Sequence, residues 1–515
     1  MRMEAWFFRN SSRLAIGIII AAFVVRVVYA GSCFMNGDEA QHFIAARPDG
    51  WLETYKASHL LAHPPLFILV LHAVLILGRT ELILRSPSLI AGTFALWLTF
   101  VWIRRCLSGI AALGGLVFMG LSPAAISAAT EVRQYGLLLF FVCCSLYATE
   151  RAFTERSTRW AMVQGLFLVA ALLTHYTALV VIVSLAFYGL LRWILDRTLG
   201  RMMLTIIATQ LIIAAVFGWL YFDHIRESPV FSSSSLFYLT PSFYLPGNET
   251  FLGFLWRALF GTFTHISTQK VALILMVGFG VGVVALLAGR TKALRPIAFL
   301  ITVPFAVGLA AAVAHVFPFA GSRHQTYLLP FIAMGFSAAL GLVKRHLAPV
   351  LLLVGAAAAP IWILRVPPDN GPWIQSVRDM SSAISYLHQE IPRGAPIFVD
   401  DQTRFILAYY LGRDDASLYI PSSGLDNGRI VGGYRLYEPS SYVWTFSPNE
   451  AFAQVNETAR SMTLPPGTPI WIVSVYVDSF ASQFPKESIR RAGEFGKISI
   501  IETAVDQPRS AAPPM

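Results

Sequence analysis

The chain has 515 residues, of which 56% are hydrophobic and only 13% are charged, and its formal net charge is +10. A soluble protein of this size is usually about 25% charged, so the composition excludes an ordinary soluble globular protein. The basic excess does not indicate nucleic acid as a partner, because much of it lies in short loops between apolar segments, where it is a topology signal.

Apolar segments recur through the first 366 positions, and most are long enough to cross a bilayer core as a helix. They do not alternate as the strands of a membrane barrel do. We therefore predict a polytopic α-helical membrane protein with about 11 to 13 transmembrane helices. The predicted spans are 14–34, 86–103, 110–127, 134–150, 160–174, 176–191, 202–221, 271–288, 296–315, 326–343 and 347–365.

The first predicted span, 14–34, follows a basic segment, 2–13, and this charge pattern predicts a cytoplasmic N-terminus. The acidic pair Asp38-Glu39 comes directly after the span and is expected on the outer face. Carboxylates that fold back toward a membrane cavity cost several kcal/mol and are usually functional, whereas a pair in a solvated loop costs little. Composition alone leaves both interpretations of this pair open.

One apolar segment, 66–78, is too short for the pattern of paired crossings. Its residues would reach about 20 Å as a helix, against a hydrocarbon core of about 30 Å. We interpret it as a re-entrant or interfacial segment, which keeps the basic loops on one side. The alternative is a full crossing that extends through Leu84, with Arg79 and Glu81 buried or close to the interface.

The composition changes after a linker marked by Pro367-Pro368 and Gly371-Pro372. We therefore divide the chain into a transmembrane domain, 1–366, and a small extracytoplasmic α/β domain, 367–515, with a disordered tail. A helical pattern runs from Val377 to Ile391, and buried strands are predicted at 396–399, 469–475 and 498–501.

The predicted outer stretches contain acids, cations and rings that suit a reaction on an anionic, lipid-linked substrate. A carboxylate can act as general base toward an acceptor hydroxyl, and arginine matches the bidentate geometry of phosphate. This set comprises Asp38, Glu39, His42, His59, His63, Glu131, Arg133, Gln134, Tyr135, His175, Tyr176, Asp223, His224, Arg323, His324 and Tyr327. Structural interpretations stay open beside this one: Glu131 and Arg133 as neighbouring ions, Arg323-His324 as an interfacial pair, and His175 as a packing residue.

The order of the motifs is more informative than any one of them. The motifs are Asp38-Glu39, His63-Pro64-Pro65-Leu66, Leu84-Arg85-Ser86-Pro87-Ser88, Leu121-Ser122-Pro123, Glu131-Val132-Arg133-Gln134-Tyr135, Thr174-His175-Tyr176-Thr177 and Arg323-His324. This series resembles the GT-C glycosyltransferases of the dolichyl-phosphate-mannose protein mannosyltransferase type. It is similar to bacterial members that attach sugars from polyprenyl phosphate to lipid A or lipopolysaccharide core. The resemblance covers about residues 10 to 345.

The resemblance implies an inverting glycosyltransferase that moves a sugar from a polyprenyl-phosphate donor to an envelope acceptor. It implies catalytic roles for Asp38 as general base, for Glu39 as its partner and for Glu131 as a second acid. The residues that it places at the substrate are His63, Arg133, Tyr135, His175, Arg323 and His324. Arg323, assisted by Arg133, is expected to neutralise the lipid phosphate.

The resemblance also implies a bacterial inner membrane location, with the active site and the C-terminal domain on the periplasmic side. The expected partners are the donor, a glycan or glycolipid acceptor and membrane lipids, with no nucleic acid. No cofactor is required and a divalent metal is optional, because arginine alone can stabilise a monophosphate leaving group. The alternatives are a transporter or flippase of lipid-linked sugars, which would explain the spans and outer charges as well, and a receptor or scaffold that uses the outer domain.

Overall fold

The computed structural model describes residues 2–226, 239–289, 294–342, 376–414, 429–439, 444, 450–477 and 480–505. The chain forms two compact units. The first unit comprises Met1–Val28, Pro48–Ile76 and Arg85–Asn370. The second comprises Tyr29–Arg47, Leu77–Leu84 and Gly371–Met515, so it includes two short segments from the N-terminal part of the chain as well as the C-terminal region.

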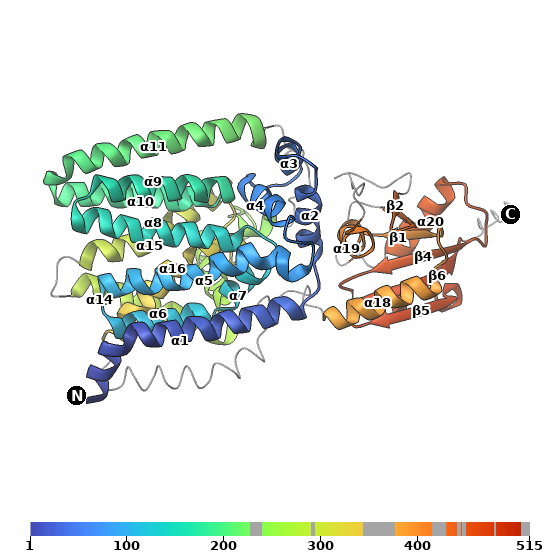
Figure 1. The fold of residues 1–515 in the computed structure, drawn as a ribbon, viewed down its shortest axis with the longest axis horizontal. Helices are drawn as coiled ribbons and strands as arrows, with labels where there is room; N and C mark the ends of the chain where they lie inside the picture. The colour runs from blue at the N-terminus through green and yellow to red at the C-terminus, as the bar shows by residue number, and fades with distance from the viewer. Residues whose placement is uncertain are drawn as a thin grey trace. The chain divides into compact units, whose positions relative to one another are not determined.

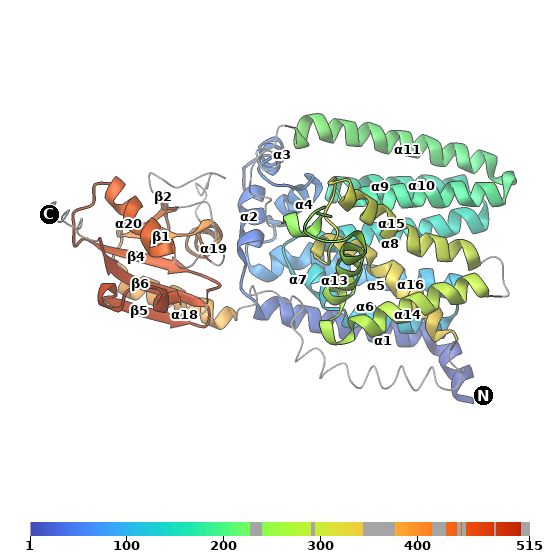
Figure 2. The same ribbon diagram turned by 180° about the vertical axis from the view of Figure 1, so that it is seen from behind.

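The first unit is a bundle of helices that lie side by side (Figures 1 and 2). Its longer helices are α1 (Arg2–Ser32), α5 (Glu81–Cys106), α8 (Tyr135–Glu155), α9 (Thr158–Thr174), α10 (Ala178–Leu195), α11 (Gly200–Leu220), α14 (Gln269–Ala288) and α15 (Arg295–Val313). The last turn of α1 and the first turn of α5 are counted with the second unit. Its shorter helices are α3 (Trp51–Ser58), α4 (Leu66–Val74), α6 (Gly109–Leu121), α7 (Pro123–Thr130), α13 (Phe251–Ile266) and α16 (Leu329–Leu340).

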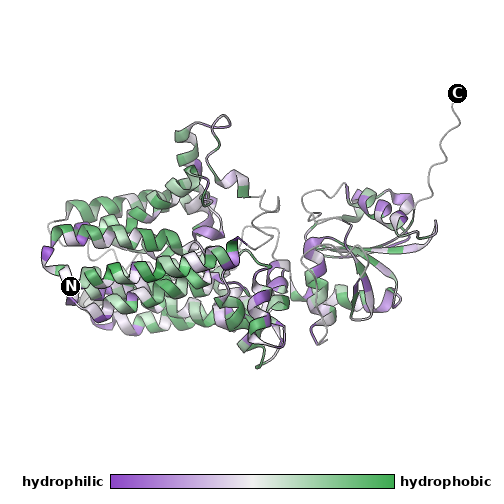
Figure 3. Cartoon of the chain, turned by 90° about the horizontal axis from the view of Figure 1, so that it is seen from above, coloured by the Kyte–Doolittle hydropathy of each residue, from purple (hydrophilic) through white to green (hydrophobic). Residues whose placement is uncertain are grey.

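Seven helices among the described residues are long and apolar enough to span a membrane, and the bent pair of α6 and α7 would add an eighth. Hydrophobic residues run along these helices, as Figure 3 shows. The prediction of a polytopic helical membrane protein is therefore confirmed. The seven are Arg9–Ser32, Glu81–Cys106, Tyr135–Glu155, Ala178–Leu195, Arg197–Ile225, Gln269–Ala288 and Arg295–Val313. The predicted span 347–365 lies outside the described residues.

The predicted span 110–127 is not one straight helix. Helices α6 and α7 meet at a 62° bend, and the break falls at Ser122. The Ser122 side chain accepts a hydrogen bond from the Ala125 backbone nitrogen, and Pro123 occupies the first helical position. Both are start signals for a new helix, so the bend has a local cause in the sequence.

Two further predicted segments form short helices. Helix α4 covers nine residues, or about 14 Å, which is less than half of a bilayer core. The segment predicted as the span 326–343 begins as a 3₁₀ helix, η5 (Arg323–Leu328), and continues as the twelve residues of α16. Arg323 and His324 therefore lie in the 3₁₀ helix and not in the regular helix that follows.

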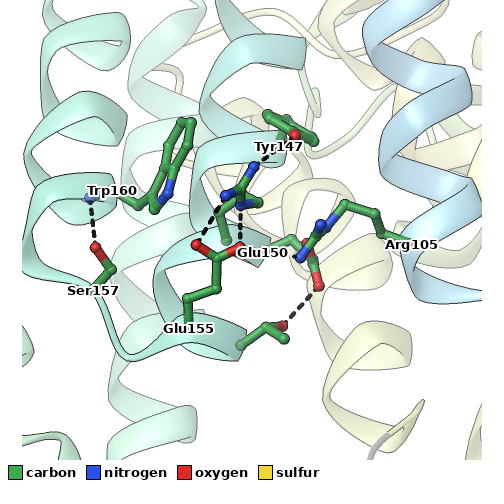
Figure 4. Close-up of polar contacts among 8 residues, drawn as sticks. Arg105, Tyr147, Glu150, Glu155, Ser157 and Trp160 are labelled. Atoms are coloured by element: carbon green, nitrogen blue, oxygen red, sulfur yellow. Dashed lines mark hydrogen bonds and ion pairs between the residues drawn. The ribbon is translucent and has the colours of Figure 1, made fainter.

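Ion pairs connect neighbouring helices at one end of the bundle (Figure 4). The Arg105 side chain of α5 pairs with Glu150 of α8 at 2.5 Å, and Arg151 pairs with Glu155 within α8. The Arg151 guanidinium also lies 4.4 Å from the ring centre of Trp160 in α9. The basic residues that follow the predicted spans thus contact acids and rings of the adjacent helix ends.

The second unit contains a six-stranded mixed sheet with the strand order β2-β3-β1-β4-β6-β5. The strands are β1 (Pro396–Val399), β2 (Arg429–Val431), β3 (Tyr434–Tyr437), β4 (Pro469–Ser474), β5 (Arg491–Phe495) and β6 (Ile498–Ala504). Strand β1 pairs in parallel with β3 and β4, and the other pairs are antiparallel. The helices are α2 (Gly37–Ala46), α18 (Val377–Glu390), α19 (Asp401–Gly412) and α20 (Ala451–Ser461).

The core of the second unit forms between α20 and the middle of the sheet. Val455 and Ala459 of α20 pack with Ile470 and Ile472 of β4 and with Ile501 of β6, and all five side chains are fully buried. The continuous apolar runs of β1, β4 and β6 follow from this position, because central strands are covered on both faces.

Candidate functional site

All six predicted substrate-binding residues lie in the first unit, at or next to the ends of its helices. His63 precedes α4, Arg133 and Tyr135 lie at the turn from α7 into α8, and His175 lies between α9 and α10. Arg323 and His324 begin η5. Apolar helices end where polar residues begin, so the same pattern that defines the helices places these side chains at their ends. We name these six residues the cation cluster.

The rings of the cation cluster surround His175. Its imidazole stacks on His63 with ring centres 5.2 Å apart, lies 5.2 Å from the Tyr135 ring, and lies 5.9 Å from the His324 ring. The guanidinium of Arg133 covers the Tyr135 ring at 5.5 Å. The structure therefore brings together residues that are up to about 260 positions apart in the sequence.

Two histidines of the cluster, His175 and His324, have lowered pKa values and are therefore neutral at physiological pH. Burial, and then the charges of Arg133 and Arg323, lower the pKa of His175 to about 3. Burial also lowers the pKa of His324 well below its ordinary value, and His175, Arg323, Arg133 and His265 add to that effect. Since these two imidazoles are neutral, the fixed positive charge beside them comes from the two arginines, whose guanidinium groups suit the geometry of phosphate.

Two uncharged polar groups of the cluster are buried and have no hydrogen-bond partner among the described residues. They are the Tyr135 hydroxyl and His175 Nε2. A buried donor that forms no hydrogen bond costs about 1–3 kcal/mol, so such groups call for an explanation. Their position beside two arginines makes the cluster chemically suited to an anionic oxygen.

The predicted second acid, Glu131, follows the last residue of α7 and precedes Arg133 by two positions. Its carboxylate accepts a hydrogen bond from the Ser127 hydroxyl one turn earlier. This contact fixes the carboxylate against α7. A catalytic role for Glu131 stays a prediction.

The predicted acids Asp38 and Glu39 lie in the first turn of α2, in the second unit. Asn36 caps this helix: its side chain accepts from the Glu39 backbone nitrogen at 3.0 Å, and the Glu39 carboxylate accepts from the Asn36 backbone nitrogen at 3.0 Å. This reciprocal capping box fixes where α2 begins. It gives Glu39, which is 1% exposed, a structural role, and it leaves Asp38 partly exposed.

Two tyrosines of the C-terminal region bond to the start of α2. The Tyr410 hydroxyl accepts from the Met35 backbone nitrogen at 2.9 Å and donates to the Glu81 carboxylate. The Tyr476 hydroxyl accepts from the Gly37 backbone nitrogen at 3.1 Å. No local sequence pattern indicates these contacts, because they join residues 375 and 439 positions apart.

A second polar group in the first unit involves other residues from the predicted outer set. The Tyr55 hydroxyl of α3 donates to Asp223, and His59 Nε2 lies 3.4 Å from the same carboxylate. Asp223 belongs to a single π-helical turn, η2 (Tyr221–Ile225). In the same turn His224 Nδ1 lies 3.0 Å from the Tyr176 hydroxyl. Single π-helical turns are frequent at functional sites.

No group of three or more His, Cys, Asp and Glu side chains in the described part of the chain is arranged to bind a metal ion. Whether a divalent metal takes part stays a prediction.

Comparisons with known proteins bear on the fold. A family model for dolichyl-phosphate-mannose-protein mannosyltransferase matches residues 62–222. The chain is similar to the crystal structure of ArnT from Cupriavidus metallidurans in the apo state, with a TM-score of 0.56 and 14% identity over 97% of this chain and 100% of that one. The undecaprenyl phosphate complex of ArnT gives a TM-score of 0.54 with the same identity and coverage.

The apo oligosaccharyltransferase of Archaeoglobus fulgidus gives a TM-score of 0.50 with 10% identity over 92% of this chain and 70% of that one. Curated protein sequences give no match. The protein is thus a multi-pass membrane protein with the GT-C glycosyltransferase fold. Within that class it resembles the dolichyl-phosphate-mannose-protein mannosyltransferases, which confirms the resemblance drawn from the order of its motifs.

Proposed function

We propose that the protein is an inverting glycosyltransferase that moves a sugar from a polyprenyl-phosphate donor to an envelope acceptor, such as lipid A or lipopolysaccharide core. The observation that carries this proposal is the cation cluster at the ends of apolar helices. It contains two arginines and two neutral polar groups that have no hydrogen-bond partner in the described part of the chain. Such a site suits a phosphate whose apolar chain lies in the membrane. The proposed location is the outer face of a bacterial inner membrane.

The proposed reaction is a single displacement at the anomeric carbon. Asp38 accepts the proton of the acceptor hydroxyl while the acceptor oxygen forms the new bond to that carbon. The bond between the anomeric carbon and the phosphate oxygen breaks, and its electron pair stays on the phosphate. Arg133 and Arg323 stabilise the charge that develops there, which requires no proton transfer to the leaving group.

The C-terminal region supports the assignment of Asp38. Hydrogen bonds from the backbone nitrogens of Met35 and Gly37 to the hydroxyls of Tyr410 and Tyr476 fix the backbone directly before and at the start of α2. Asp38 is the second residue of that helix, so its carboxylate extends from a fixed backbone while remaining partly exposed. A general base needs both features, because it must be held within reach of the acceptor and must still be accessible to it.

The test is transfer by purified protein in detergent, where no second compartment exists and transport alone gives no product. Wild type is expected to form glycosylated acceptor from a polyprenyl-phosphate sugar, with inversion at the anomeric carbon. The Asp38→Asn variant is expected to form none, while Asp49→Asn, at a carboxylate in the following loop, is expected to resemble wild type.

Near-normal turnover by Asp38→Asn would reject that residue as the base, and a product of retained configuration would reject the single displacement. Absence of transfer by wild type across donors and acceptors, together with movement of the lipid-linked sugar across reconstituted vesicles, would identify a flippase instead.

A further inference from the structure

The local structure around His175 determines which of its nitrogens carries the proton. The backbone nitrogen of Thr177 donates to His175 Nδ1 at 3.1 Å, and the Thr177 hydroxyl lies 2.9 Å from the same atom. A backbone N–H can only donate, so Nδ1 presents its lone pair and the proton of the neutral ring lies on Nε2. Thr177 is fully buried at the start of α10, which keeps this arrangement away from competing water.

The ring that carries the resulting Nε2–H group lies among the rings of the cation cluster. His175 is 3% exposed, and Nε2 is buried without a hydrogen-bond partner among the described residues. The Tyr135 hydroxyl, on the ring 5.2 Å away, is in the same situation. Folding has therefore removed two neutral donors from water and left them beside the guanidinium groups of the cluster.

Charged and titratable groups face His175 from every element around it. Arg133 and Tyr135 come from the turn into α8, His63 from the segment before α4, and Arg323 and His324 from η5. Two more groups lie one step further away. His265 of α13 acts on His324, and Glu131 lies two positions before Arg133, bonded to Ser127.

A second proton on the His175 ring is opposed in two independent ways. It would have to lie on Nδ1, where it would point at the N–H of Thr177, and it would add a positive charge beside Arg133 and Arg323. The geometry of Thr177 alone opposes the imidazolium, before any electrostatic effect is considered.

We propose that His175 is a permanently neutral hydrogen-bond donor to an anionic oxygen of the polyprenyl-phosphate donor, fixed in its Nε2–H tautomer by Thr177 and assisted by the Tyr135 hydroxyl. This role rests on the proposed function and deepens it. It assigns positive charge to the two arginines and directional, uncharged donors to His175 and Tyr135. The contribution of His175 to anion binding is then constant from pH 5.5 to 8.

The test uses a polyprenyl sulfate as probe, because a sulfate monoester carries one negative charge throughout this pH range, whereas a phosphate monoester itself titrates. Dissociation constants are measured at pH 5.5, 6.5, 7.5 and 8 for the full-length protein in detergent. His175→Phe keeps a ring and removes the donor, and it is expected to weaken binding roughly ten- to a hundredfold. His175→Gln keeps an uncharged N–H near the position of Nε2 and is expected to recover much of that loss.

The variants are compared with His388→Gln, which alters a histidine of the C-terminal region that bonds to Tyr434. The ratio of the dissociation constants of wild type and His175→Gln is expected to be the same at all four pH values. Nitrogen-15 spectra of histidine-labelled protein, assigned by difference with His175→Gln, are expected to show an unprotonated Nδ1 and a protonated Nε2 over the same range. This second readout stays decisive if His175→Phe folds poorly.

A wild-type affinity that falls tenfold or more between pH 5.5 and 8, while that of His175→Gln does not, would overturn the proposal. So would imidazolium signals from His175, or equal affinities for wild type and a folded His175→Phe variant. If any of these occurs in protein that still transfers sugar, the role of His175 fails and the proposed function stands. If wild type neither transfers sugar nor binds polyprenyl phosphate or sulfate, the proposed function itself fails.

Discussion

The hydroxyl of Tyr476 lies 3.1 Å from the backbone nitrogen of Gly37, the residue that begins the acid-bearing helix α2. Tyr476 is 2% exposed, and its backbone has a positive φ of 82°, which is uncommon for a residue with a side chain. Its ring stacks on Phe34 with centres 6.1 Å apart. The C-terminal region thus bonds to the backbone of α2 directly, and we expect it to position Asp38 rather than only to cover it.

Replacing Tyr476 with phenylalanine tests this positioning. The ring is kept and one hydrogen bond of about 1 kcal/mol is lost, so kcat is expected to fall severalfold while the affinity for polyprenyl phosphate stays unchanged. Steady-state kinetics and a binding measurement on the same preparation check the two parts. Tyr434→Phe is the matched control, because that hydroxyl is also buried and bonds to His388. Equal effects of the two substitutions on kcat would contradict a positioning role for Tyr476.

The capping box separates two roles of Glu39. Glutamine can close a capping box as glutamate does, because either side chain accepts from the N-cap backbone nitrogen. If Glu39 acts through the cap, Glu39→Gln is expected to keep most of the transfer activity. Glu39→Ala is then expected to lower the free energy of unfolding by about 1 kcal/mol and to reduce activity. Thermal unfolding and transfer assays distinguish them, and a catalytic Glu39 would show the opposite: loss of activity in Glu39→Gln at unchanged stability.

The buried histidines predict how stability depends on pH. The unfolded His175 side chain binds a proton near pH 6.5, whereas the folded side chain does so only near pH 3. Between these values the unfolded state carries more protons, so the stability present above pH 6.5 is lost as the pH falls toward 3, by up to about 1.4 kcal/mol per unit for each such histidine.

His175→Gln is expected to reduce this pH dependence, and His324, whose pKa is also lowered, accounts for part of the remainder. Midpoints of thermal unfolding at pH 5 and pH 7 provide the measurement, with His388→Gln as control. An identical decrease between the two pH values in wild type and His175→Gln would show that His175 titrates normally in the folded protein.

Two glycines of α14 differ sharply in their surroundings. A side chain at Gly282 would lie 1.8 Å from the backbone oxygen of Gly335 in α16, whereas nothing lies within 4 Å of one at Gly280. Gly282→Ala is therefore expected to push α14 and α16 apart and to lower the midpoint of thermal unfolding by several degrees. Gly280→Ala is expected to leave it unchanged or to raise it slightly, because alanine favours the helix by about 1 kcal/mol. Similar midpoints for both variants would contradict the close packing of these helices.

The sequence predicted those parts of the structure that depend on local runs of apolar residues. Long apolar runs gave most of the spanning helices, and the apolar strands at 396–399, 469–475 and 498–501 are three adjacent strands of the sheet. The short strands β2, β3 and β5 were not predicted, because they lie toward the sheet edges, where a strand does not need a continuous apolar run. The bend at Ser122 was also missed, although the serine and the proline that cause it are visible in the sequence.

The members of the cation cluster could be selected from the sequence, because the order of the motifs linked them as a set. The tautomer of His175 could not be predicted, since it depends on the backbone geometry at Thr177. The roles of Tyr410 and Tyr476 were also inaccessible. A tyrosine that bonds to a backbone nitrogen hundreds of residues away leaves no periodic or compositional trace.

The composition of the second unit has a practical consequence for protein engineering. Residues 29–47 and 77–84 belong to the same compact unit as the C-terminal region, so a chimera cut only at the linker near position 370 would separate tyrosine hydroxyls from the amides that they bind. A functional exchange of C-terminal regions between homologous enzymes would have to transplant all three segments together. Grafts that move only the sheet are expected to yield inserted, well-expressed proteins without turnover.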